Sequence, residues 1–171
     1  MTLLVAALSA AAAVTSCSGG RAATATPGST TTTTAPDPMR GLVVPTSKLD
    51  VRQCVKDLPS AEQRPYAVLV VPCGEPHLYE IFYRGAIGGA KPPGADAEYP
   101  GELAVANQAE QQCVDAFAGY VGTAWSDSDY DFQAWWPSGA SWTDRGDRTV
   151  TCGAFRYDGG TTEGSISGSG K

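Results

Sequence analysis

The residues with the clearest capacity for chemistry follow an apolar run at positions 68–71. His77, the only histidine of the chain, lies between Glu75 and Glu80. An imidazole beside carboxylates can act as a general base or bind a metal. A metal site needs three or four ligands, however, and the sequence shows no second histidine and no free-cysteine pair at ligand spacing. We therefore expect His77 to be structural, bonded to backbone or capping the turn after Cys73, and we predict neither a metal nor a cofactor.

Clustered carboxylates are a second candidate for chemistry. Asp127, Asp129 and Asp131 lie beside an aromatic run and could imitate the paired acids of a glycoside hydrolase. An acidic loop is more often a solvated surface, and the chain has no Gly-x-Ser-x-Gly nucleophile motif. The sequence therefore favours a non-catalytic protein. The enzymatic alternative is a hydrolase of wall glycan that uses the acids near Asp129 or the group of Glu75, His77 and Glu80.

The four tryptophans, Trp125, Trp135, Trp136 and Trp142, lie within eighteen positions. Aromatic faces can stack on sugar rings as well as fill cores. Trp135 and Trp136 are adjacent and would face opposite sides of a strand, so one is expected in the core and the other exposed or under a loop. Trp135, Trp136 and Trp142 are therefore candidate glycan-binding residues, with simple packing as the competing interpretation. The adhesion-like tripeptide at 145–147 is explained by a turn.

The elements that would position these side chains are strands on either side of one long helix. Continuous apolar character predicts an interior strand at 66–71, with a strand at 78–83 paired beside it. A short element is expected at 49–58, a surface loop at 85–100, strands at 130–136 and 148–157, and turns at 137–139 and 144–147. The helix begins near Glu102 and ends at Gly122. Its predicted apolar stripe is Leu103, Ala106, Ala109, Cys113, Phe117 and Tyr120.

Four cysteines fall within these elements, an even number that is typical of an exported disulfide framework. Four cysteines allow three pairings. Cys152 shares a strand face with Val150 and Ala154, and Cys113 lies on the apolar stripe of the helix. We therefore favour a Cys113–Cys152 disulfide and, by elimination, a Cys54–Cys73 disulfide.

The start of the chain has the composition of an export signal. Residues 3–14 form an apolar run too short to span a membrane, and Val14-Thr15-Ser16-Cys17 follows it in the order of a bacterial lipobox. We predict a signal peptide at 1–16 and a lipid on Cys17, followed by a disordered Ser/Thr/Pro/Ala tether at 17–40. The net charge of -6 excludes a nucleic-acid partner, since phosphate binding needs clustered Lys and Arg.

The chain resembles the septum formation family of small exported or membrane-attached domains found mainly in actinobacteria. The matching residues run in order from Cys54 through Val71-Pro72-Cys73-Gly74-Glu75-Pro76-His77, Glu80, Tyr99-Pro100-Gly101, Cys113, Phe117, Tyr120-Val121-Gly122, Trp142, Gly146-Asp147-Arg148, Val150 and Cys152 to Gly164-Ser165-Ile166. The resemblance implies an envelope location, two disulfides and a link with division septa. It implies no established activity, and it adds His77, Glu80, Asp147 and Arg148 as candidate binding residues.

Together these patterns predict an α+β domain at 41–171, with an antiparallel sheet of about five strands and one main helix packed on one face. We expect a non-catalytic lipoprotein at the outer face of the cell membrane. Its expected partners are the membrane, through the lipid anchor, and an envelope protein or cell-wall glycan. Extracytoplasmic glycan binding or hydrolysis is the alternative function.

Overall fold

The computed structural model describes residues 40–57 and 67–171. The predicted signal peptide and Cys17 lie outside these residues, as does the predicted tether apart from Arg40. The strands are β1 (Val43–Pro45), β2 (Cys54–Asp57), β3 (Ala67–Val71), β4 (Tyr79–Ala86), β5 (Tyr130–Trp135) and β6 (Thr149–Arg156). The helices are α1 (Glu102–Val121) and α2 (Gly139–Arg145), with 3-10 turns η1 (Thr46–Lys48) and η2 (Trp125–Asp127).

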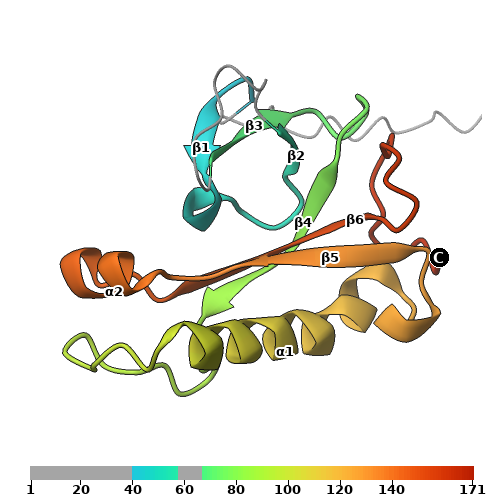
Figure 1. Cartoon of the computed structure of the whole chain (residues 1–171). Helices are drawn as coiled ribbons and strands as arrows, with labels where there is room; N and C mark the ends of the chain where they lie inside the picture. Colours follow the sequence, from blue (N-terminus) through green and yellow to red (C-terminus); the bar gives the residue numbers. More distant parts are fainter. Residues whose placement is uncertain (1–39, 58–66) are drawn as a thin grey trace, which may run out of the picture. The chain divides into compact units, whose positions relative to one another are not determined.

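The six strands form one antiparallel sheet in the order β1-β3-β2-β4-β6-β5, which confirms the predicted α+β class (Figure 1). One predicted pairing was wrong. The strand at 78–83 does not lie beside the strand at 66–71, because β2 is inserted between β3 and β4 and pairs with both. The apolar run identifies a buried strand but carries no information about its neighbours, since any apolar surface can cover it.

Helix α1 packs along one face of β4, β5 and β6 (Figure 1). It begins after Gly101 and ends at Gly122, whose left-handed φ of 95° closes the helix as predicted. Its buried face was predicted only in part: Ala109, Cys113 and Phe117 are buried as predicted, but the first turn was assigned wrongly. Leu103 is 74% exposed, and the buried residues are Val105, Ala109, Cys113, Phe117 and Val121. None of the helices among the described residues has the length and apolar character needed to span a membrane.

The sheet separates two apolar cores. Neighbouring residues of β4 illustrate the separation, because Ile81 lies in one core and Phe82 in the other. The larger core contains α1, and the smaller one joins β1, β2 and β3 with Leu49. The Cys113–Cys152 disulfide lies in the larger core and joins α1 to β6, whereas Cys54–Cys73 joins β2 to the turn before β4. Both predicted pairings are confirmed.

Two predicted turns prove to be the ends of α2. Ser138 caps its first turn by accepting a hydrogen bond from the Ser141 backbone N–H at 3.1 Å. Gly146 ends the helix in the left-handed conformation with φ of 62°. The predicted loop at 85–100 begins later than expected, because β4 extends to Ala86 by pairing with β6. These two features place the end of β4, α2 and the start of β6 at one corner of the domain.

Candidate functional site

Glu80, one of the two chemical candidates near the start of β4, is a buried carboxylate that accepts three hydrogen bonds. It is 1% exposed. Its Oε1 accepts hydrogen bonds from the Tyr120 hydroxyl at 2.6 Å and the Ser165 hydroxyl at 2.6 Å, and its Oε2 accepts one from the Ile166 backbone N–H at 2.7 Å. Burial, and then the hydrogen bond to Glu80, raise the pKa of Tyr120. Glu80 therefore joins β4 to the end of α1 and to the segment around Ile166.

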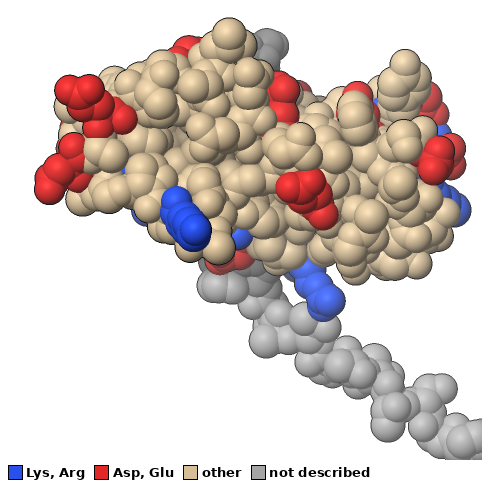
Figure 2. Space-filling view, turned by 90° about the horizontal axis from the view of Figure 1, so that it is seen from below, with Lys and Arg blue, Asp and Glu red and all other residues tan. Residues whose placement is uncertain are grey.

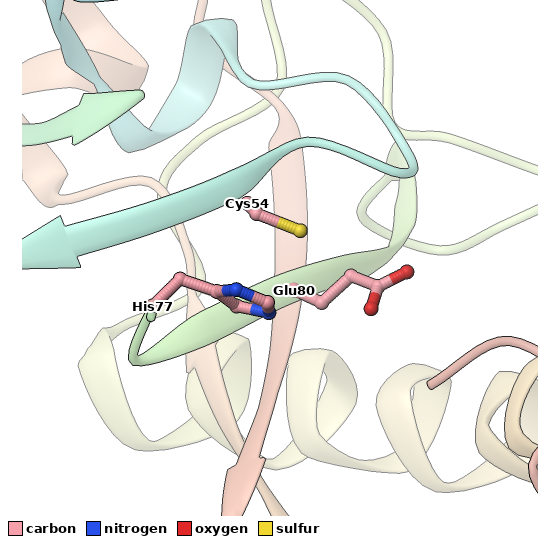
Figure 3. Close-up of side chains that lie close together, drawn as sticks. All are labelled: Cys54, His77 and Glu80. Atoms are coloured by element: carbon pink, nitrogen blue, oxygen red, sulfur yellow. The ribbon is translucent and has the colours of Figure 1, made fainter. Parts of the chain in front are cut away.

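His77 is fully buried and is held by backbone groups. Its N–H and C=O pair with Thr162 at 3.0 and 2.9 Å, and its Nδ1 lies 2.9 Å from the Glu75 carbonyl oxygen. The carbonyl can only accept, so Nδ1 carries the proton and donates it. Nε2 is buried without a hydrogen-bond partner among the described residues. Figure 3 shows the imidazole beside Cys54 and Glu80, and one donor atom of each of these three residues lies within 4.8 Å of the other two.

The predicted acidic group is dispersed. Asp127 and Asp129 are exposed. The Asp131 carboxylate is occupied locally, because its Oδ1 accepts hydrogen bonds from Trp125 Nε1 at 2.9 Å and from the Phe132 backbone N–H at 2.8 Å. These contacts orient the Trp125 indole, and they explain the position of Asp131 without a catalytic role.

The tryptophans do not share one surface. Trp135 packs against the smaller core and makes an edge contact with Tyr79 at 5.3 Å, while its adjacent neighbour Trp136 packs against the larger core. The two rings thus lie on opposite sides of the sheet, as the alternation predicted. Trp142 is 3% exposed and donates its Nε1 hydrogen to the Ala97 carbonyl at 2.7 Å. Trp136 Nε1 donates to Glu102 at 2.7 Å, and this hydrogen bond lowers the Glu102 pKa.

Arg148 stacks on Trp142 and is immobilised by carbonyl groups. Its guanidinium carbon lies 3.5 Å from the centre of the indole ring. Its NH1 donates to the carbonyls of Trp142 and Asp147, and its NH2 donates to those of Gly94 and Ala95, at 2.9 to 3.3 Å. None of these partners carries a formal charge. The positive charge of Arg148 is therefore fixed in place without being neutralised.

The corner that holds Arg148 contains an open hollow of about 730 Å³. Four cationic residues line it: Lys48 from η1, Arg84 from β4, Arg145 from α2 and Arg148 from β6. Among the residues that the structure describes, Asp147 is the one carboxylate in the lining, and its Oδ1 already accepts a hydrogen bond from the Thr149 backbone N–H at 3.0 Å. We call this feature the basic hollow. It concentrates positive charge on a chain whose net charge is -6.

The cations of the basic hollow differ in how far they are neutralised. Lys48 and Arg145 are exposed and make no ion pair or hydrogen bond with any residue that the structure describes. Arg84 donates to the Ser47 carbonyl at 3.3 Å and lies 3.9 Å from Asp50, an exposed pair that screening by water makes weak. The opposite side of the domain differs. The α1 face is mostly uncharged in Figure 2, and α1 itself contains no Lys or Arg.

A smaller hollow of about 180 Å³ adjoins the basic hollow and shares Pro45, Ser47, Arg145 and Asp147 with it. Trp136 contributes to its lining, together with Ser138 and Ser141 of the α2 cap. The structure therefore brings together three predicted binding residues, Trp136, Asp147 and Arg148, at one corner. Trp142 lies beneath Arg148, whereas His77, Glu80 and Trp135 belong to the packing of the domain interior.

Sequence analysis did not identify Lys48, Arg84 or Arg145 as site residues. They are single cations spread over almost one hundred positions, and no local pattern connects them. Only the sheet pairing of β4 with β6, together with the return of η1 to the same corner, brings them into one lining.

Comparison of the chain with known proteins identifies its family. Neither the curated proteins nor the solved structures gave a match. The family model described as "Septum formation" matches residues 53–170, which covers both disulfides, the buried Glu80 group and most of the basic hollow. This family is not a known family of enzymes. Because the match spans most of the chain, the chain belongs to the septum formation family.

Proposed function

We propose that the chain is a non-catalytic envelope protein that binds an oxyanion-bearing envelope ligand, a phosphate or carboxylate group on a wall polymer, in the basic hollow. The observation that carries the proposal is the convergence of four cationic side chains on one open hollow in an acidic protein. Such a concentration of positive charge attracts anions and raises their local concentration.

The geometry of the basic hollow suits an oxyanion. Arg148 cannot turn away, because its stacking on Trp142 and its carbonyl contacts fix the guanidinium before a ligand arrives. Arg145 is free to offer two parallel N–H groups to a phosphate or carboxylate, and Lys48 adds a mobile point charge. One fixed cation and two adaptable ones would orient the ligand without demanding a single shape.

An extracytoplasmic location is consistent with a ligand on a wall polymer. The two disulfides and the family membership indicate an extracytoplasmic location. Within our proposal, a lipid on Cys17 holds the protein to the outer face of the membrane, and residues 18–38 act as a tether that lets the domain reach the wall. A role at division septa is the form of this function that the family name supports.

Glycan binding is the second candidate, and Trp136 is the observation that favours it. Its ring lines the smaller hollow beside the cations, so a sugar ring there could carry its acidic group into the basic hollow. In that case both candidate functions describe one ligand, an acidic glycan of the wall.

Sedimentation of the full chain with purified cell walls tests the proposal. We expect the double variant Lys48→Ala/Arg145→Ala to bind about 5- to 30-fold more weakly, because two exposed charge contacts contribute about 1 to 2 kcal/mol in total. Lys91→Ala/Lys171→Ala removes the same charge from outside the hollow and is the matched control. Equal loss of binding in both variants would show that net charge matters and the basic hollow does not. A tagged chain that is not enriched at septa would count against the septal role alone.

A further inference from the structure

The hydrogen bonds of the His77 imidazole resemble those of a metal-binding histidine. In metal sites the ligating imidazole almost always donates its other ring N–H to a carbonyl or a carboxylate, which fixes the tautomer and exposes one lone pair. His77 does this, since Nδ1 donates to the Glu75 carbonyl and Nε2 is left buried without a partner among the described residues. An unpartnered polar atom in a fully buried side chain requires a physical explanation.

A sulfur atom lies close to the His77 ring. The sulfur of Cys54, a ring nitrogen of His77 and a carboxylate oxygen of Glu80 all lie within 4.8 Å of one another (Figure 3). Cys73 is not one of these three residues, but its sulfur is bonded to the sulfur of Cys54 and is therefore adjacent to the group. Only three residues separate Cys73 from His77 in the sequence, a spacing found between ligand pairs of structural zinc sites. Cys54 comes from a different strand, which is why sequence spacing alone does not reveal the set.

The disulfide controls whether these atoms can bind a metal, because thiolates are metal ligands and a disulfide sulfur is a poor one. The two disulfides differ in access. Cys113 and Cys152 are both fully buried, whereas Cys73 is half-buried at the surface. A reducing agent therefore reaches Cys54–Cys73 first.

We propose that reduction of the Cys54–Cys73 disulfide creates a site for Zn²⁺ or a similar transition metal, with Cys54, Cys73 and His77 as ligands. A dithiol supplies two electrons and two protons, becoming a cyclic disulfide while Cys54 and Cys73 become thiols. The metal then displaces two thiol protons and accepts the Nε2 lone pair. Glu80 is the nearest fourth donor, and three hydrogen bonds leave one of its roughly four acceptor positions open.

The metal would preserve the connection that the disulfide makes. In both states β2 stays joined to the turn before β4, so this corner keeps its structure whether the cysteines are oxidised or reduced. The two states exclude each other, and metal binding would report the redox state of the compartment. This inference is independent of the basic hollow.

The test uses the full chain, reduced by a dithiol that is then removed without air, and titrated with Co²⁺ as a spectroscopic probe. Mass mapping first confirms that Cys113–Cys152 remains oxidised. We expect one Co²⁺ per chain, with a thiolate charge-transfer band and the strong visible bands of a tetrahedral site, in the reduced chain only. His77→Gln should weaken binding by at least about tenfold. Equal affinity in His77→Gln, or no binding by the reduced wild type, would overturn the proposal.

A second measurement avoids reliance on a variant that may not fold. Because His77 is the only histidine, ¹⁵N labelling of histidine gives one imidazole to observe in the wild-type chain. On addition of Zn²⁺ to the reduced chain, the Nε2 resonance should shift while Nδ1 keeps its proton. An unchanged Nε2 resonance would show that the thiols bind metal without His77, and the site proposed here would be wrong.

Discussion

Replacing Glu80 with glutamine tests how much stability a single buried carboxylate contributes to this domain. The charged side chain accepts three hydrogen bonds at 2.6 to 2.7 Å while 1% exposed. In Glu80→Gln the side-chain NH₂ should face the Tyr120 and Ser165 hydroxyls, which can rotate to accept its hydrogen bonds. The amide oxygen still accepts the hydrogen bond from the Ile166 N–H. All three contacts persist, but none involves a charged acceptor.

The expected loss in the free energy of unfolding follows from the replacement of a charged acceptor by a neutral one. A hydrogen bond to a charged group contributes about 1.5 to 3 kcal/mol and a neutral one about 0.5 to 1.5, so the three weakened contacts sum to about 3 kcal/mol. Glu80→Ala removes the acceptor of all three bonds and leaves the buried Ile166 N–H without a partner, whereas the half-buried Tyr120 and exposed Ser165 hydroxyls can bond water. It should cost more than Glu80→Gln, a large part of the stability of a typical domain.

Urea unfolding of the oxidised chain, followed by far-ultraviolet circular dichroism, measures the effect. With a slope of about 1 to 3 kcal/mol per molar, Glu80→Gln should lower the midpoint by about 1 to 3 M. Glu110→Gln makes the same chemical change at an exposed position of α1 and should stay within about 0.5 kcal/mol of wild type. If both variants unfold at the same midpoint, the account of Glu80 as the polar centre of the fold is refuted.

Two further predictions concern α1. Burial, and then the hydrogen bond to Glu80, raise the Tyr120 pKa above its ordinary value of 10.0, so this residue contributes full stability below pH 10 and loses it as the pH rises further. Urea midpoints should therefore fall less steeply above pH 10 in Tyr120→Phe than in wild type. Burial also raises the pKa of Tyr79, which is present in both proteins and therefore contributes the same background to each. Identical slopes in the two proteins would contradict the assignment to Tyr120. Val105→Ala should cost about 2 kcal/mol and Leu103→Ala less than about 0.5, because Val105 is fully buried and Leu103 is 74% exposed. Thermal melts in the opposite order would mean that α1 is rotated from the orientation described here.

The cysteine pairs were predictable because the residue repeat of a helix or a strand determines the face on which each side chain lies. Cys113 recurs with the buried positions of a helix and Cys152 alternates with those of a strand, so each was assigned to the core before any contact was known. The same reasoning failed for Leu103, because the first turn of α1 carries apolar residues on more than one side. Contacts with the sheet, rather than composition, select Val105 for the interior.

Strand order and the basic hollow lay beyond sequence reasoning for a different reason. Nothing in residues 54–57 shows that they separate β3 from β4, since a short strand can pair with any free edge. Likewise Lys48, Arg84 and Arg145 are ordinary surface cations until the sheet brings them together. His77 and Glu80 were identified because a lone histidine among acids is conspicuous. Apart from the bond between His77 and the Glu75 carbonyl, however, the hydrogen bonds described for them depend on residues 40 to 86 positions away.

Residues 162–170 complete contacts made by much earlier parts of the chain. Thr162 pairs with His77, Gly164 donates to the Cys73 carbonyl, Ile166 fills the Glu80 site, and the N–H groups of Gly168 and Gly170 bond the last carbonyls of α1. Contacts of such long range form late, because the intervening chain must be ordered first. Until residues 162–170 pair with them, His77, Glu80 and the last turn of α1 lack these hydrogen-bond partners, so we expect the domain to complete its folding only once this segment has docked.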